Sequence, residues 1–371
     1  YLDNGREPND FAILYRSTAQ SRSVEQALMR QKQPYTIWGG VRFFDRKEIK
    51  DCIAYLRLVE YGDDLSFKRV VNVPSRKFGK AKLEALEQIA KSEGTTLFKA
   101  LQNHQDEKPF KSEPIKGFLA TLAVASAQKN NVSIADLLTM VLDKTGLDQL
   151  YREDTDEERV DNINELIGSI RYYEQTNINE DVRLDTYLQD IALFTNSDYK
   201  KDQKTIKLMT IHQSKGLEFP YVFVTGLTEG IFPSHRSIRD RKAEGLEEER
   251  RLMYVAITRA EKALYLTESE GYNYSTKSEK YPSRFLSEIS KDLIKVEGHI
   301  DPALLLERDI LVNQLNAEIS EDEMPFVEGD MVKHEVFGEG VVLSVNEERK
   351  SCEVDFGNKT RNIQWQFLTA W

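Results

Sequence analysis

The chain has 371 residues, of which 40% are hydrophobic, and a formal net charge of −11 at pH 7. This length favours two or three domains, and the apolar content is sufficient for their cores. The two cysteines exclude a disulfide framework. No apolar run approaches the roughly 18 residues that span a membrane, so we expect a cytoplasmic protein with no membrane partner.

The net charge hides an uneven distribution. Residues 68–82 contain six basic and no acidic side chains, whereas residues 291–330 contain three basic and eleven acidic ones. Because a phosphate responds to the face that it meets and not to the average charge, the acidic total does not exclude a nucleic-acid partner.

The first part of the chain alternates between strand and helix patterns. Residues 11–15 (FAILY) form a short apolar run typical of a strand, and residues 17–29 follow as a helix. Residues 35–38 predict a second strand, which a Gly-Gly pair ends, and residues 46–59 predict an amphipathic helix. This order predicts a parallel α/β sheet.

A long helical stretch then interrupts the sheet pattern. Residues 67–200 contain little strand signal and several helical stretches, at 81–92, 115–128, 134–142, 159–175 and 185–194. Strand patterns resume at residue 205 with IKLMTI, YVFVTG and ALYLTE, and a helix at 247–259 lies between the last two. We therefore predict one α/β domain that an all-helical insertion interrupts, which is tolerated when the ends of the insertion lie close together.

The C-terminal part shows two further patterns. Residues 291–326 are acidic and predict a flexible linker. From residue 327 apolar and polar residues alternate in four or five short segments, with glycine, asparagine and charged residues between them. This alternation predicts a small β-barrel of the SH3/Tudor type.

Two blocks join apolar runs to polar groups that a fold alone does not require: TIHQSKGLEF at 210–219 and EEERRLMYVAITRA at 247–260. In the first, a strand brings Thr210 and His212 to its carboxyl end, where α/β proteins place ligands. These two side chains can donate to phosphates, and Glu218 can accept from ribose hydroxyls. An ordinary polar junction between strands also explains this block, and a cation at a helix C-terminus also explains Arg259.

The two blocks closely resemble the fifth and sixth signature motifs of superfamily 1 DNA helicases of the PcrA/UvrD/Rep type, and the resemblance extends over nearly the whole chain. It implies a RecA-like domain in two parts, a helical insertion, a linker and a Tudor-like tail. The corresponding segments are 1–66 and 205–290, 67–204, 291–326, and 327–371.

The resemblance also implies roles in nucleotide chemistry. Glu218 would contact the ribose of ATP, Gly216 would lie in the same nucleotide-binding turn, and Arg259 would be an arginine finger at the γ-phosphate. No G-x-x-x-x-G-K-[ST] phosphate loop occurs in this sequence. We expect an N-terminal RecA-like domain to supply that loop and the Mg²⁺ ligands, no metal site in this chain, and no ATP hydrolysis by this chain alone.

DNA contacts follow from the same resemblance. Thr210 and His212 would touch single-stranded DNA, and Arg16 would contact its backbone phosphates after the first strand. The alternative for Arg16 is a surface arginine that pairs with a carboxylate. In YPSRFLSEI (281–289), Arg284 is another candidate for a backbone phosphate.

The segment VPSRKFGKAKLEAL (73–86) predicts a contact with duplex DNA. A proline turn, Gly79 and a helix N-terminus are surrounded by Arg76, Lys77, Lys80 and Lys82, which favours sequence-independent binding to the duplex backbone. The segment resembles the helix–hairpin–helix-like element of the family, in which a glycine stands at the position of Lys77. A solvated basic face is the alternative.

We therefore expect the C-terminal half of an ATP-dependent 3′→5′ DNA helicase of repair or replication. Its partners would be single-stranded and duplex DNA and, through the tail, RNA polymerase. One alternative is a non-catalytic scaffold that binds DNA or the polymerase. A second is a helicase–nuclease subunit, against which the short tail argues.

Overall fold

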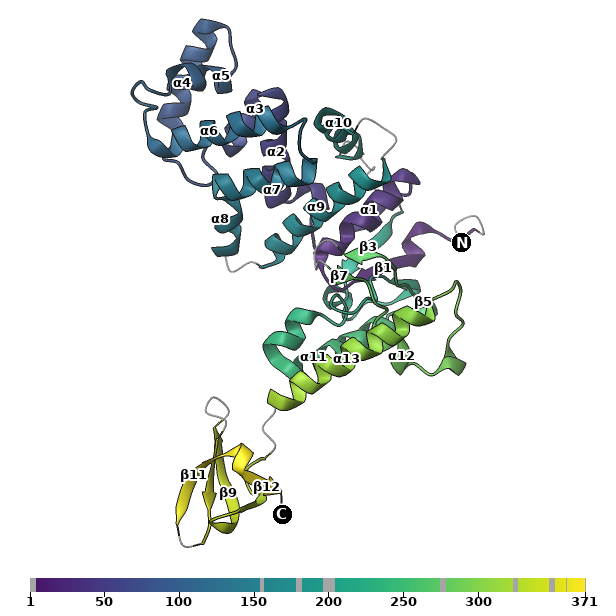
Figure 1. Ribbon diagram of the computed structural model, residues 1–371. Coiled ribbons are helices and arrows are strands. Elements are labelled where there is room, and N and C mark those ends of the chain that lie inside the picture. The colour runs from purple at the N-terminus through teal and green to yellow at the C-terminus, as the bar shows by residue number, and fades with distance from the viewer. Residues whose placement is uncertain are drawn as a thin grey trace. The chain divides into compact units, whose positions relative to one another are not determined.

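The computed structural model describes residues 5–153, 157–177, 182–195, 204–273, 278–322, 326–346, 351–357 and 359–370 (Figure 1). The chain divides into two compact units, which are described separately. The first contains residues 1–235 and 248–298, and the second contains residues 236–247 and 299–371.

A five-stranded parallel sheet organises the first unit. Its strands are β1 (Phe11–Tyr15), β2 (Tyr35–Ile37), β3 (Ile206–Thr210), β4 (Phe219–Val224) and β5 (Ala260–Leu266), in the order β2-β3-β1-β4-β5. Thus β3, which follows the long helical segment in sequence, lies between β1 and β2. The prediction of a parallel α/β sheet interrupted by helices is confirmed, and the arrangement fits a RecA-like domain.

Two helices accompany this sheet. Helix α1 (Ser21–Arg30) places Val24, Leu28 and Met29 against a cluster that includes Phe11 and Tyr15 of β1. Helix α11 (His235–Ile257) connects β4 to β5; it begins before the predicted residue 247, and its backbone is not helical at Lys242. Because β4 and β5 are parallel, the helix returns the chain from the carboxyl to the amino edge of the sheet.

The helical block lies between β2 and β3 in the sequence (Figure 1). It contains α2 (Lys47–Tyr61), α3 (Asp64–Val70), α4 (Lys80–Glu93), α5 (Leu97–His104), α6 (Glu113–Gln128), α7 (Ile134–Thr145), α8 (Leu147–Glu153), α9 (Glu157–Thr176) and α10 (Leu184–Thr195). We expected this part to begin at residue 67, but its core cluster begins at Phe43 and includes α2. The sequence pattern of α2 could not reveal this, because an amphipathic helix packs equally well on a sheet or on helices.

A polar network joins the helical block to the sheet region. The guanidinium of Arg46 donates to the carbonyl oxygen of Thr18 (3.0 Å), to Oγ of Ser21 (3.0 Å) and to Oδ1 of Asn162 in α9 (2.6 Å). Arg22 of α1 adds an ion pair with Glu165 of α9 at 2.8 Å. These contacts hold α9 against the segment that follows β1.

The segment predicted as a flexible linker contains a helix, which corrects that expectation. Helix α13 (Pro302–Asp322) occupies 21 of the residues between 291 and 326. The prediction weighed the acidic charge of this segment and overlooked its leucine, alanine and glutamate content, which favours helix.

Five antiparallel strands follow α13 in the second unit. They are β8 (Met331–His334), β9 (Gly338–Asn346), β10 (Ser351–Asp355), β11 (Thr360–Gln364) and β12 (Leu368–Ala370), in the order β11-β10-β9-β8-β12. Val332, Val342 and Val354 lie in their buried core, and Trp365 packs against it.

The expected closed barrel is not confirmed. Among the described residues, the strand pairings run from β11 through to β12, and none joins these two strands to each other. Alternation in a sequence predicts strands and hairpins, but closure depends on twist and stagger, which the alternation does not specify.

Candidate functional site

The residues predicted to contact single-stranded DNA and those predicted to contact the nucleotide lie at opposite edges of the parallel sheet. Arg16 follows β1 and His212 follows β3, so both lie at the carboxyl edge. Glu218 precedes β4 and Arg259 precedes β5, so both lie at the amino edge. The chain between β3 and β4 is a crossover of eight residues, 211–218, and the first motif block therefore contributes to both edges.

Arg259 is held against the residues that flank Glu218. Its Nη1 donates to the carbonyl oxygen of Leu217 (2.7 Å), and its own carbonyl oxygen accepts from the backbone N–H of Phe219 (2.9 Å). Glu218, the residue between these two contacts, is exposed. Arg259 is therefore anchored to the backbone on both sides of Glu218.

Two further bonds orient the Arg259 side chain. Nε donates to the carbonyl oxygen of Val255 (3.0 Å) and Nη2 to Oγ1 of Thr258 (3.0 Å). Three of the five guanidinium N–H groups are thus directed into its own domain, and the side chain remains half-buried. This is a preorganised cation with donors left for a ligand.

Gly216 makes the turn before Glu218. Its φ is +84°, a left-handed conformation that a residue with a Cβ rarely adopts, and no heavy atom lies within 4 Å of the position a Cβ would take. The glycine is therefore required by the backbone conformation and not by crowding.

At the carboxyl edge, Thr210 and Gln213 bond to each other across the turn after β3. The amide of Thr210 donates to Oε1 of Gln213 (3.1 Å), and the amide of Gln213 donates to Oγ1 of Thr210 (3.3 Å). The Thr210 hydroxyl thus has a local structural task that the sequence reading did not include. Nε2 of Gln213 also donates to the carbonyl oxygen of Gly39 after β2 (3.2 Å).

Arg16 forms an ion pair with Glu249 of α11. Its Nε lies 3.0 and 2.9 Å from the two carboxylate oxygens, and its Nη2 lies 2.6 Å from Oε1. Glu249 also accepts from the backbone N–H of Ser234 (3.0 Å). The alternative reading of Arg16, an arginine that pairs with a carboxylate, describes this contact; the DNA role stays a prediction.

Glu249 is the residue that sequence reasoning missed. Its side chain is only 2% exposed. A signal was present, because Glu249 lies three, four and seven residues before the buried Leu252, Met253 and Ala256, on the same helical face.

His212 lies in the field of this ion pair. Partial burial lowers the pKa of its imidazole from the ordinary value of 6.5, and the positive charge of Arg16 lowers it further, while Glu249 and Glu248 oppose these effects. The imidazole is therefore neutral at pH 7, and it is exposed to a ligand.

Arg76, expected at the duplex backbone, is a core residue instead, which corrects that assignment. It is 5% exposed, and its guanidinium donates to the carbonyl oxygens of Val70 (3.1 Å) and Pro74 (3.1 Å) and to the Tyr55 hydroxyl (3.0 Å). It also lies over the ring of Phe118. A sequence reveals the charge of an arginine but not its burial.

The remaining basic residues of this segment are accessible. Lys77, Gly79 and Lys80 are exposed, and Lys82 is half-buried. Lys77 has a φ of +55°, so it adopts the left-handed conformation for which a glycine is suited. The backbone thus keeps the turn despite the substitution, and Gly79 is the N-cap of α4.

Arg284 is also buried, which corrects its assignment to a DNA phosphate. Its guanidinium pairs with the carboxylate of Glu229, with Nη2 and Oε2 3.1 Å apart, and the two side chains are 7% and 1% exposed. The backbone N–H of Arg284 donates to the same carboxylate at 2.6 Å. The pair ties the segment after β4 to the short helix α12 (Arg284–Glu288).

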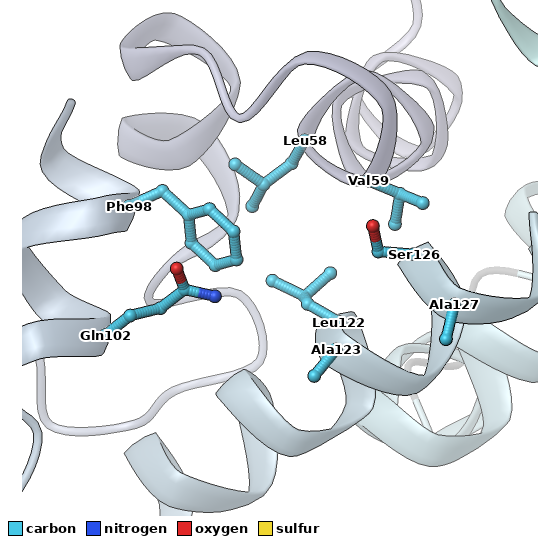
Figure 2. Close-up of a pocket in the computed structure, with 8 residues that line it drawn as sticks. All are labelled: Leu58, Val59, Phe98, Gln102, Leu122, Ala123, Ser126 and Ala127. Carbon is cyan, nitrogen blue, oxygen red and sulfur yellow. The ribbon is translucent and has the colours of Figure 1, made fainter.

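A pocket of about 360 Å³ lies elsewhere, among α2, α5 and α6 of the helical block (Figure 2). Its lining is mostly apolar, with Gln102 and Ser126 as polar members, and it includes none of the predicted site residues. Within the described part of the chain, no group of three His, Cys, Asp or Glu side chains is placed to hold a metal ion. In the same part, no helix has the length and apolar content needed to cross a membrane.

Comparison with known proteins gives the family. Residues 1–271 match the UvrD-like helicase C-terminal domain. The ATP-dependent DNA helicase PcrA of Staphylococcus epidermidis is 35% identical over 367 residues, covering 95% of this chain and 50% of that protein. DNA helicase II of Haemophilus influenzae is 34% identical over 378 residues, covering 98% and 51%. The chain spans about half the length of these curated relatives, and it belongs to the family of UvrD-like helicase C-terminal domains.

Proposed function

We propose that this chain is the second motor domain of an ATP-dependent 3′→5′ DNA helicase, together with its helical insertion and tail. The observation that carries the proposal is the contact between Arg259 and the backbone on both sides of Glu218. It joins the two motif blocks at the amino edge of the sheet, to which one block contributes Arg259 and the other contributes Glu218.

The amino edge suits a nucleotide. Glu218 is exposed and can accept from ribose hydroxyls, while Arg259 can donate to a phosphate from a fixed position. A bound ATP would supply the phosphoanhydride bond to be cleaved, and Arg259 would stabilise the charge that develops at the γ-phosphate. We assign the Mg²⁺ ligands and the phosphate loop to the N-terminal RecA-like domain of the complete protein.

The carboxyl edge suits a single strand of DNA. His212 is exposed, and Thr210 and Arg16 lie at the ends of the adjacent strands β3 and β1. Two edges with separate ligands suit a translocase, because nucleotide-driven movement of this domain would displace the strand on its other edge. Duplex DNA would contact the exposed Lys77 and Lys80 in the helical insertion.

For the tail we propose an SH3/Tudor-like module that docks RNA polymerase. The strand that comes first in the chain, β8, pairs with the strand that comes last, β12. A 3-10 helix (Trp365–Phe367) precedes β12. These features support a compact module with its own core. Exposed Val336, Leu343 and Phe367 offer apolar contact area for a protein partner.

The nucleotide part is tested in the full-length protein with Arg259→Ala. We expect the kcat of DNA-dependent ATP hydrolysis to fall about a thousandfold or more, with DNA affinity nearly unchanged. Glu218→Ala should mainly raise the KM for ATP. Arg250→Ala is the matched control, because Arg250 lies on the same helix and pairs with Glu288 at the surface. Unchanged ATP hydrolysis in both test variants would refute these assignments, whereas no DNA-dependent ATP hydrolysis by the unmodified full-length protein would favour the non-catalytic scaffold.

A further inference from the structure

An exposed tryptophan stands beside the carboxyl edge. Trp38 follows β2 and is 47% exposed, although indole is among the side chains that gain most from burial. A single exposed aromatic residue is common and carries no function by itself. A role for Trp38 therefore depends on its position relative to the proposed DNA contacts.

The backbone around Trp38 is fixed to the turn that holds Thr210. The amide of Trp38 donates to the carbonyl oxygen of Leu208 in β3 (2.8 Å), two residues before Thr210. The next residue, Gly39, accepts from the Gln213 side chain, which also bonds to the Thr210 amide. The ring is therefore carried by rigid backbone and adjoins the proposed DNA contacts.

The three neighbouring strands determine the distance between Trp38 and Arg16 along the carboxyl edge. In the order β2-β3-β1, Trp38 follows the first strand, Thr210 ends the second, and Arg16 follows the third. Adjacent strands lie about 4.8 Å apart, so the backbones at Trp38 and Arg16 are separated by about 10 Å along the edge. Neighbouring nucleotides of one DNA strand can cover this span.

The charges at this edge favour stacking over attraction to phosphate. Glu249 neutralises Arg16, and His212 is neutral at pH 7 because its pKa is lowered. Single-strand binding sites combine cations with aromatic rings on which bases stack. Where the cations are compensated, the aromatic ring must contribute a larger share of the affinity.

We propose that Trp38 is a stacking platform for one base of the single-stranded DNA whose backbone meets the turn between Thr210 and His212. This inference rests on the proposed function of the carboxyl edge and adds a residue that none of the motif blocks contains. Stacking on indole does not distinguish bases strongly, so the contact is sequence-tolerant.

The test measures binding of a fluorescein-labelled oligo-dT to the 371-residue chain by anisotropy, over a range of salt concentrations. Trp38→Ala should weaken binding about fivefold to a hundredfold, with the slope of log K against log salt unchanged, because no phosphate contact is lost. Trp38→Phe keeps an aromatic face and should retain most of the affinity. Tyr172→Ala, at an exposed tyrosine of α9, is the matched control and should bind as the unmodified chain does.

Tryptophan emission supplies a second readout. Binding of unlabelled oligo-dT should quench the emission of the unmodified chain, and Trp38→Phe should lose this quenching while it still binds. Unchanged affinity in Trp38→Ala, or equal quenching in Trp38→Phe, would overturn the inference. If His212→Ala weakens binding in the same assay and Trp38→Ala does not, this inference alone fails; if the unmodified chain does not bind oligo-dT, the proposed DNA edge fails with it.

Discussion

Arg16 and Glu249, which are 233 residues apart in the sequence, form an ion pair through two nitrogens of the guanidinium. One partner follows the first strand and the other lies on the helix before the last strand. The pair therefore links the N-terminal part of the α/β domain to its C-terminal part at the carboxyl edge of the sheet. Because the carboxylate is buried, the loss of Arg16 would leave an uncompensated negative charge in the protein interior.

We predict that Arg16→Ala lowers the free energy of unfolding by about 3 kcal/mol, the loss typical of an unpaired buried charge. Chemical denaturation of the 371-residue chain measures this. Glu249→Gln should cost less, since it leaves no buried charge and keeps the acceptor for the Ser234 amide. If Arg16→Ala kept full stability and instead reduced the salt dependence of single-strand binding, the main role of Arg16 would be a contact with DNA phosphate and not the ion pair with Glu249.

Duplex binding should depend on the lysines at the start of α4. Replacing Lys77, Lys80 and Lys82 by alanine should lower duplex affinity and flatten its salt dependence, by up to about 0.9 in log–log slope per lost phosphate contact. Fluorescence anisotropy with a blunt duplex measures both quantities. A control with Lys91, Lys108 and Lys144 replaced removes the same charge from other exposed positions of the helical block. Equal effects in both variants would mean that only the net charge matters.

The pH dependence of single-strand binding should report His212. Its pKa lies below 6.5 in the unbound protein, mainly because of partial burial. A phosphate contact favours the protonated imidazole, so binding takes up a proton and the affinity rises as the pH falls below about 6.5. His212→Gln should flatten this profile between pH 5.5 and 7.5. His104→Gln is the control, because that histidine pairs with Glu93 in the helical block; equal flattening in the control would remove His212 from the contact.

The tail should be separable from the motor. Removing residues 325–371 from the full-length protein should leave DNA-dependent ATP hydrolysis and unwinding largely intact and should abolish retention of RNA polymerase in a pull-down. The physical reason is that the five strands bury a core of their own, with Val332, Val342 and Val354 at its centre. Loss of unwinding with retained polymerase would place this module in the motor.

Much of the fold follows from the sequence because its strands are short apolar runs and its long helices are amphipathic. FAILY and IKLMT each form a strand that the hydrophobic pattern predicts. Helix α13 was missed because the prediction weighed the acidic charge of the segment and not the helix propensity of its leucine, alanine and glutamate residues. The motif blocks supplied the candidate site residues; the structure places Arg259 against the backbone of Leu217 and Phe219, which flank Glu218, and the roles of Arg259 and Glu218 stay predictions.

Burial of charged groups was beyond the sequence analysis. Arg76 and Arg284 lie among lysines or next to a proline and serine in the sequence, which is equally typical of a surface phosphate contact. Some of their partners come from distant segments, such as Thr145 for Arg76 and Glu229 for Arg284, which no local pattern identifies. The split of the first motif block between two edges was missed for a similar reason, since it depends on the path of residues 211–218 across the sheet.

The most direct measurement of the central claim is ATP hydrolysis by the purified 371-residue chain, with and without single-stranded DNA. The chain contains the proposed arginine finger but no G-x-x-x-x-G-K-[ST] phosphate loop. We therefore predict no turnover above background under either condition. DNA-stimulated turnover that Arg259→Ala abolishes would contradict the account, because the chain would then be a complete motor by itself.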